Sequence, residues 1–121
     1  MPALIISTSI DLLRVTTDNI VYIASEGNYS NLVLSDGETR LVTLQLGQIE
    51  RLIGEQLKDT CGDFVRIGKS LIVNKNYIFY IHPAKQQLML SNGNGVKYTL
   101  SASREALRML KDLLCEMVTG E

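Results

Sequence analysis

The sequence has few of the residues that build metal sites. Its 121 residues include two cysteines and one histidine. Cys61 and Cys115 lie too far apart to form a CxxC pair, and His82 has no second imidazole to complete a cluster with metal-ligand spacing. These spacings exclude the usual structural zinc motifs, so we expect no metal and no cofactor.

Catalytic motifs are lacking as well. His82 stands where a predicted strand runs into Pro83, without a nucleophile motif, and this position indicates a turn or structural histidine. Neither G-x-x-x-x-G-K-[ST] nor G-x-G-x-x-G occurs, and "GNGVKYT" leads into a predicted strand rather than the helix N-terminus that binds phosphate. We therefore predict no enzymatic activity, no catalytic residues and no small-molecule substrate.

Long apolar runs and a basic leader are also missing. The start "MPALIISTSIDLL" lacks the charged opening of a secretory signal, and no stretch approaches about 18 consecutive apolar residues, the length of a membrane span. With 45% hydrophobic residues, the chain has the size and apolar content of one ordinary domain. We expect a single cytoplasmic domain over 1–121, without membrane association.

Acidic residues are absent from one third of the chain. The net charge is −1, which by itself gives no sign of a polyanionic partner. Nevertheless, residues 1–63 carry four basic and nine acidic side chains, whereas residues 64–104 carry six basic and no acidic ones. The tendency of strands to avoid Asp and Glu accounts for the missing acids. It accounts less well for the retained cations, and charge alone leaves both an anionic partner and a strand effect open.

The hydrophobic pattern predicts a mostly β domain with two helices, an α+β fold. Short β-branched and aromatic runs with a period of two begin at "DLLRVTT" and continue as three strands over 20–24, 29–34 and 39–43. Asp36-Gly37 predicts a type I′ hairpin turn between the last two, and Gly27-Asn28 marks the turn before them. Leu46, Ile49 and Ile53 then fall at helical spacing, so we expect a helix over about 45–58.

The second half repeats the strand pattern and ends in another helix. Four further strand candidates are "FVRIGKSLIVN", "YIFYIHP", "QQLMLSN" and "GVKYTLS", the last two joined by the hairpin signal "NGNG" at 92–95. A helix is predicted from about Ser103, with Leu107, Leu110 and Leu114 on one side and either Ser101 or Ser103 as its N-cap. No linker or internal repeat divides the chain.

Several ordered motifs resemble one known family. The runs "NIVYIASEGNYSNLVLSDGETRLVTLQLGQIERLI", "FVRIGKSLIVNKNYI", "LMLSNG" and "YTLSASREALRML" are similar, in this order, to the LytTR DNA-binding domain over a core of about 8–114. The resemblance implies a compact fold of small antiparallel sheets that inserts loops into the major grooves of double-stranded DNA in bacterial transcription regulation. Such domains usually follow a receiver domain in response regulators, and we expect no receiver domain here.

The resemblance also implies site residues. The family's first DNA contact comes from the loop after the "YIEA.GNY" strand, which corresponds to Asn28, Tyr29 and Ser30. The second comes from "RIHRSYIVN", here "RIGKSLIVN". This segment makes Arg66, Lys69 and Ser70 candidates, with Gly68 in place of the family's histidine and Lys69 in place of its arginine.

The third contact segment, "VSRSYRK" in the family, is "LSASREA" here, and its arginine position holds Ala102. Ser101, Ser103 and Arg104 are the candidates in this segment, where Arg104 lies two residues beyond the family's arginine. Lys97, Lys69 and Arg104 are expected to contact phosphates and set the register on DNA. The family often occupies paired direct sites, so a homodimer on DNA is also expected from the resemblance.

Two other functions stay open. The near-neutral charge and the replacements at Gly68 and Ala102 fit a protein-interaction module, for example an antagonist of a full-length regulator. RNA binding ranks below both, because no aromatic stacking motif of the "GFGFV" kind occurs. A continuous positive face would favour DNA, and dispersed lysines would favour the interaction module.

Overall fold

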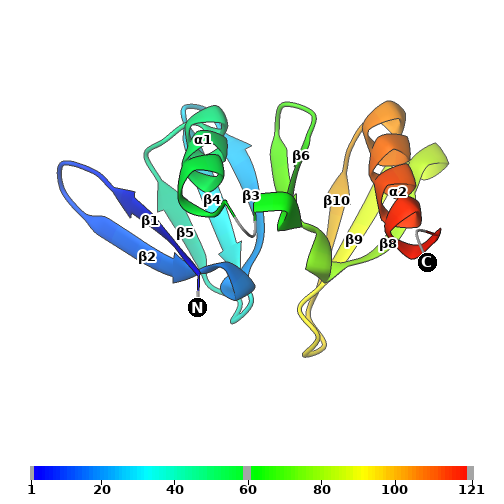
Figure 1. Cartoon of the computed structure of the whole chain (residues 1–121), viewed down its shortest axis with the longest axis horizontal. Helices are drawn as coiled ribbons and strands as arrows, with labels where there is room; N and C mark the ends of the chain where they lie inside the picture. The colour runs from blue at the N-terminus through cyan, green and yellow to red at the C-terminus, as the bar shows by residue number, and fades with distance from the viewer. Residues whose placement is uncertain (1, 59–60, 120–121) are drawn as a thin grey trace. The chain divides into compact units, whose positions relative to one another are not determined.

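The computed structural model describes residues 2–58 and 61–119. In this part of the chain, ten β-strands form three antiparallel sheets, and two α-helices accompany them, which confirms the predicted fold class. The chain divides into two compact units, Met1–Asn76 and Tyr77–Glu121. Figure 1 labels the elements of each unit.

The first unit holds a two-stranded sheet, a five-stranded sheet and helix α1 (Leu46–Gln56). The two-stranded sheet pairs β1 (Ala3–Ser7) with β2 (Leu12–Thr16). The five-stranded sheet has the order β5-β4-β3-β7-β6, in which β3 pairs with both β4 and β7. Its strands are β3 Ile20–Glu26, β4 Tyr29–Leu34, β5 Thr39–Val42, β6 Phe64–Ile67 and β7 Leu71–Asn74.

The core of this unit lies between one face of the five-stranded sheet and α1. Ile23 is paired across the sheet with Leu32 on one side and Ile72 on the other, and all three are almost fully buried. Helix α1 contributes Ile49 and Ile53, one turn apart. Burial of such a side chain is worth about 1.5–3 kcal/mol. It therefore outweighs the about 1 kcal/mol that each of the two helical glycines costs, and the predicted helix over 45–58 is confirmed.

The turn between β4 and β5 differs from the prediction. A type I′ turn needs positive φ at both central residues. Here Gly37 has φ +91°, whereas Asp36 does not take positive φ. The Gly37 amide donates to Leu34 O at 3.0 Å, and the Leu34 amide donates to Glu38 O at 2.8 Å. The type I′ prediction is therefore wrong, and a three-residue loop with a glycine at its last position joins the strands.

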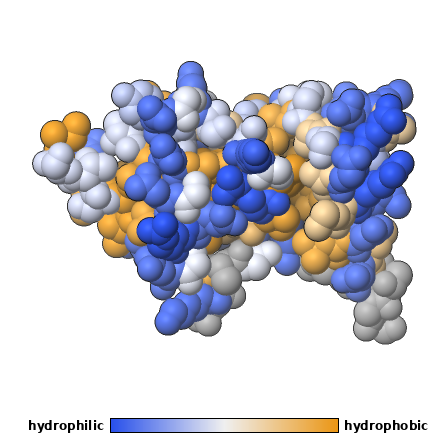
Figure 2. Space-filling view, turned by 90° about the horizontal axis from the view of Figure 1, so that it is seen from above, coloured by the Kyte–Doolittle hydropathy of each residue, from blue (hydrophilic) through white to orange (hydrophobic). Residues whose placement is uncertain are grey.

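The sequence pattern also missed one turn and one strand. The segment "FVRIGKSLIVN" is not one strand but the hairpin β6–β7, in which Ile67 pairs with Leu71 and Gly68 turns the chain at φ +60°. Strand β1 was not predicted, although it pairs with β2. The tip of the β1–β2 hairpin carries Ile10, which is 84% exposed. Hydrophobic surface is visible at the left end of Figure 2.

The second unit is a three-stranded sheet with helix α2 (Arg104–Thr119). The sheet has the order β10-β9-β8, so the predicted hairpin at 92–95 is confirmed as the β9–β10 connection. Its core includes Leu88 and Leu90 of the middle strand and Leu107 and Leu110 of α2, all at most 2% exposed. The strands are β8 Ile78–His82, β9 Gln87–Ser91 and β10 Lys97–Ser101.

Candidate nucleic-acid interface

Two turns of the first unit lie at the same end of its five-stranded sheet. The β3–β4 turn consists of Gly27, with φ +62°, and Asn28, because Glu26 pairs with Tyr29. The β6–β7 turn spans residues 68–70. Both lie at the top of Figure 1. Since β3 and β7 are neighbouring strands, about 4.8 Å apart, the antiparallel pairing brings the two turns side by side.

A backbone hydrogen bond continues this pairing into the turns. The amide of Ser25 donates to the carbonyl oxygen of Ser70 at 2.8 Å. The adjacent side chains remain accessible: Asn28, Lys69 and Ser70 are exposed, and Tyr29 is 47% exposed. The side-chain amide of Gln45, just before α1, approaches Asn28 Oδ1 at 3.5 Å. The fold therefore brings four of the predicted contact residues together on one exposed edge.

Ser30 is a correction to the expected contact set. Its side chain is 0% exposed, and its hydroxyl donates to the carbonyl oxygen of Leu44 at 2.8 Å. Strand β4 turns this residue inward, because side chains alternate between the two faces of a strand. Ser30 therefore holds the segment between β5 and α1 against the sheet and is not available to a ligand in this structure.

Arg66 is also occupied within the protein. Its Nη1 donates to Glu50 Oε1 at 2.8 Å in an ion pair, and its Nε donates to the Gly68 carbonyl oxygen at 3.1 Å. A longer bond of 3.4 Å joins its Nη2 to the carbonyl oxygen of Lys69. The predicted cation of β6 thus contacts the backbone of the turn, whereas Lys69 extends its ammonium group from that turn. No sequence signal indicated Glu50, because the contact joins two elements 16 residues apart.

In the second unit, three predicted residues lie where β10 passes into α2. Ser101 is the last residue of β10, and Arg104 is the first residue of α2; both are exposed. The hydroxyl of Ser103 accepts a hydrogen bond from the Ala106 amide at 3.1 Å, which identifies Ser103 as the N-cap. The sequence allowed either Ser101 or Ser103 as the N-cap, and the structure shows that Ser103 is the cap.

Lys97 lies apart from these residues. It is the first residue of β10, paired with Ser91 beside the β9–β10 hairpin, whereas Ser101 is the last residue. Four residue steps along a strand separate their Cα atoms by about 13 Å. The ammonium group of Lys97 lies 4.6 Å from the centre of the Phe79 ring, a cation–π contact. The structure therefore does not gather Lys97 with Ser101, Ser103 and Arg104.

The residues considered for catalysis and metal binding take structural positions. Nδ1 of His82 accepts a hydrogen bond from the Lys85 amide at 3.2 Å in a short 3₁₀ turn, which confirms the turn prediction. Among residues 2–58 and 61–119, no group of three or more His, Cys, Asp or Glu side chains could hold a metal ion. Cys115 is exposed on α2, and the side chain of Cys61 lies outside the described residues.

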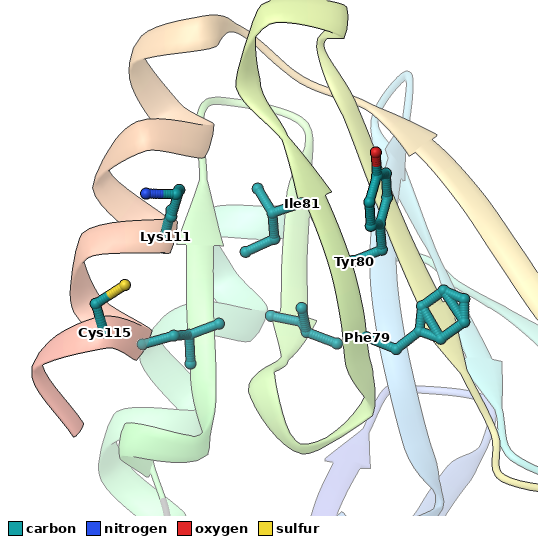
Figure 3. Close-up of a pocket in the computed structure, with 7 residues that line it drawn as sticks. Phe79, Tyr80, Ile81, Lys111 and Cys115 are labelled. Carbon is teal, nitrogen blue, oxygen red and sulfur yellow. The ribbon is translucent and has the colours of Figure 1, made fainter. Parts of the chain in front are cut away.

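The second unit also contains an apolar groove between β8 and α2. Figure 3 shows Lys111 and Cys115 on α2, Ile81 on the neighbouring strand β8, and Phe79 and Tyr80 on the side of Ile81 farther from the helix. Its lining offers one ammonium group, one thiol and the hydroxyl of Tyr80. It holds neither an imidazole, the group that most often carries general acid–base catalysis, nor a carboxylate.

Comparison with known proteins identifies the fold and the family. The family model for the LytTr DNA-binding domain matches residues 11–115, most of the chain. The chain belongs to the LytTR family of DNA-binding domains. A similar solved structure is the LytTr DNA-binding domain of a Bacillus cereus protein named as a methyl-accepting/DNA response regulator. The alignment has a TM-score of 0.63 and 21% identity, and covers 94% of this chain and 97% of that one. No curated protein matches the sequence.

Family membership confirms the resemblance and the prediction that this LytTR chain is not an enzyme. It also implies DNA binding in transcription regulation. Among the described residues, no helix has the length and apolar character needed to cross a membrane.

Proposed function

We propose that this LytTR domain binds double-stranded DNA sequence-selectively by inserting turns into the major groove. The main support for this proposal is the backbone hydrogen bond between Ser25 and Ser70, which holds the β3–β4 and β6–β7 turns side by side. The major groove, about 12 Å wide, admits a two-stranded β-ribbon, and each of these turns joins two neighbouring strands at one end of the five-stranded sheet.

The exposed side chains of the two turns suit this role. The amide of Asn28 and the hydroxyls of Tyr29 and Ser70 can hydrogen-bond to base edges or phosphates. The ammonium group of Lys69 can reach a phosphate or a guanine edge. In the second unit, Arg104 and Ser101 are proposed to supply further contacts. Because Ser30 and Arg66 are engaged within the fold, and Lys97 lies at the far end of β10, they are left out of this set.

The biological setting is part of the same proposal. A duplex DNA partner requires the chain to work in the bacterial cytoplasm. Two copies on neighbouring direct sites would double the number of phosphate contacts. Affinity would then rise more steeply as salt is lowered, since each neutralised phosphate releases counterions.

The test is DNA binding by fluorescence anisotropy over a salt series, with a duplex selected from a random library. We expect Lys69→Ala and Arg104→Ala each to weaken binding to the selected duplex by about 1–3 kcal/mol. Arg14→Ala is the control, because Arg14 is an exposed cation on β2 that lies away from the two turns. It pairs with Ile5, whose amide donates to the side chain of Gln56 at the C-terminal end of α1. Gln45, which approaches Asn28, precedes the other end of that helix.

A failure would be equally informative. If every duplex binds no better than about 10⁻⁴ M at moderate salt, affinity lies below ordinary non-specific binding. The DNA-reading proposal would then be rejected in favour of the protein-interaction module that the near-neutral charge also fits.

A further inference from the structure

Every carbonyl oxygen of the β6–β7 turn accepts a hydrogen bond from a donor inside the first unit. Arg66 donates to the carbonyl oxygens of Gly68 at 3.1 Å and Lys69 at 3.4 Å. Ser25 donates its amide to the carbonyl oxygen of Ser70 at 2.8 Å. The turn therefore keeps its acceptors bonded to the protein, and the side chains of Lys69 and Ser70 extend outward.

We propose that Arg66, anchored by Glu50 of α1, is a positioning residue that holds the β6–β7 turn in its DNA-binding form. In this role Arg66 acts through Lys69 and Ser70 and does not itself touch DNA. The inference rests on the proposed function. According to this inference, the Arg66–Glu50 pair sets the direction in which Lys69 and Ser70 point. Membership of the family does not by itself give the pair this role.

The geometry of the guanidinium group explains why an arginine serves here. Its planar fork presents donors in fixed directions, so one side chain can bind a carboxylate and two carbonyl oxygens at once. The Glu50 carboxylate occupies Nη1 at 2.8 Å, which leaves Nε and Nη2 facing the turn. A lysine would carry the same charge on a single flexible ammonium group and could not hold all three acceptors in this arrangement.

The arrangement also has an electrostatic consequence. Carbonyl oxygens carry partial negative charge, and free ones at the tip of the turn would repel the phosphates that Lys69 is proposed to approach. The guanidinium group binds two of these oxygens. The turn can then present its cation without competing acceptors.

The exposure of the pair argues against a role in stability alone. The side chain of Arg66 is 28% exposed and that of Glu50 is 52% exposed. Ion pairs this accessible to water contribute little to folding. The bonds from Arg66 to the turn instead restrict three residues that contain a glycine and would otherwise sample many conformations.

Two roles for Arg66 predict opposite effects of removing Glu50. If Arg66 contacts DNA directly, Glu50→Ala frees its guanidinium group and removes a negative charge, so DNA affinity increases. If Arg66 positions the turn, Glu50→Ala releases the anchor, and affinity for the selected duplex falls. Glu55→Ala is the matched control, because it removes the same charge from another exposed position on α1.

The experiment measures binding of the whole chain and these variants to the selected duplex and to a random duplex, each over a salt series. We expect Arg66→Lys and Glu50→Ala to lose about tenfold in affinity for the selected duplex, the equivalent of one base-reading contact. The salt slope should stay close to the wild-type value, because Lys69 keeps its charge beside the phosphates and only its position in the groove changes. Affinity for random duplex should change little, and Glu55→Ala should bind like the wild type.

Amide NMR spectra of the free chain give a second readout. Both variants should shift the signals of Gly68, Lys69 and Ser70 while thermal unfolding stays close to that of the wild type. Stronger binding by Glu50→Ala, or wild-type binding and spectra for Arg66→Lys, would overturn the inference and leave the proposed function standing. Absence of binding by the wild type would reject the proposed function, and the role of the pair in DNA binding with it.

Discussion

The backbone amide of Ser25 lies 2.8 Å from the carbonyl oxygen of Ser70, and this bond joins the end of β3 to the β6–β7 turn, more than forty residues away in the chain. Strands β3 and β7 pair only as far as Ala24 and Leu71. The Ser25–Ser70 bond therefore extends their ladder to the exposed edge. Its consequence is that Asn28 and Lys69 belong to one surface of the first unit.

Removal of the Ser30 hydroxyl should reduce stability. The hydroxyl is buried and donates to the Leu44 carbonyl oxygen, so Ser30→Ala leaves that acceptor without its partner. We expect a loss of about 1–2 kcal/mol in the free energy of unfolding, measured by urea denaturation. Ser25→Ala, at the exposed position directly opposite, should stay within about 0.5 kcal/mol of the wild type. Equal losses in the two variants would contradict the burial of Ser30.

Two glycine substitutions should have opposite effects on stability. Gly68 has φ +60°, so Gly68→Ala should destabilise the chain by about 1–2 kcal/mol, the cost of a left-handed residue with a Cβ atom. Gly68→Asn should cost less, because asparagine tolerates this conformation. Gly54 lies in α1, where an added Cβ atom would meet no other atom within 4 Å, and Gly54→Ala should stabilise by about 1 kcal/mol. Chemical denaturation measures all three, and a stabilising Gly68→Ala would be inconsistent with this turn.

The cap of α2 can be tested with two serines. Ser103→Ala removes the hydroxyl that accepts from the Ala106 amide and should lower the free energy of unfolding by about 1 kcal/mol. Ser101→Ala is the control, because Ser101 ends β10 two residues before the cap. Thermal unfolding followed by circular dichroism compares the two. A larger loss for Ser101→Ala would show that the cap had been assigned to the wrong serine.

Lys97 and Lys69 should differ in their effect on the salt dependence of DNA binding. Lys97 lies over the Phe79 ring at the far end of β10, so Lys97→Ala should leave the slope of log K against log salt unchanged. Lys69→Ala should reduce that slope by about 1, as expected for one lost phosphate contact. A reduced slope for Lys97→Ala would contradict this prediction and show that Lys97 contacts a phosphate.

Much of the fold follows from local patterns in the sequence. The spacing of Ile49 and Ile53 marks α1, because a helix places residues about one turn apart on the same face. The glycines at 93 and 95 mark the β9–β10 hairpin, because positive φ at a turn favours residues without a Cβ atom. These features depend on neighbours along the chain, and the ordered motifs also sufficed to predict the family that the comparison confirms.

The tertiary structure alone decided what the polar residues do. In sequence, Ser30 and Arg66 resemble their contact-making neighbours. In the fold, Ser30 meets the carbonyl oxygen of Leu44, and Arg66 meets Glu50, both from segments more than ten residues away. The turn at Asp36 likewise depends on how β4 and β5 pair. The periodicity of hydrophobic residues and the composition of turns are properties of neighbouring residues in the sequence. The hydrogen-bond partner of a polar group instead depends on which distant segment the folded chain places beside it.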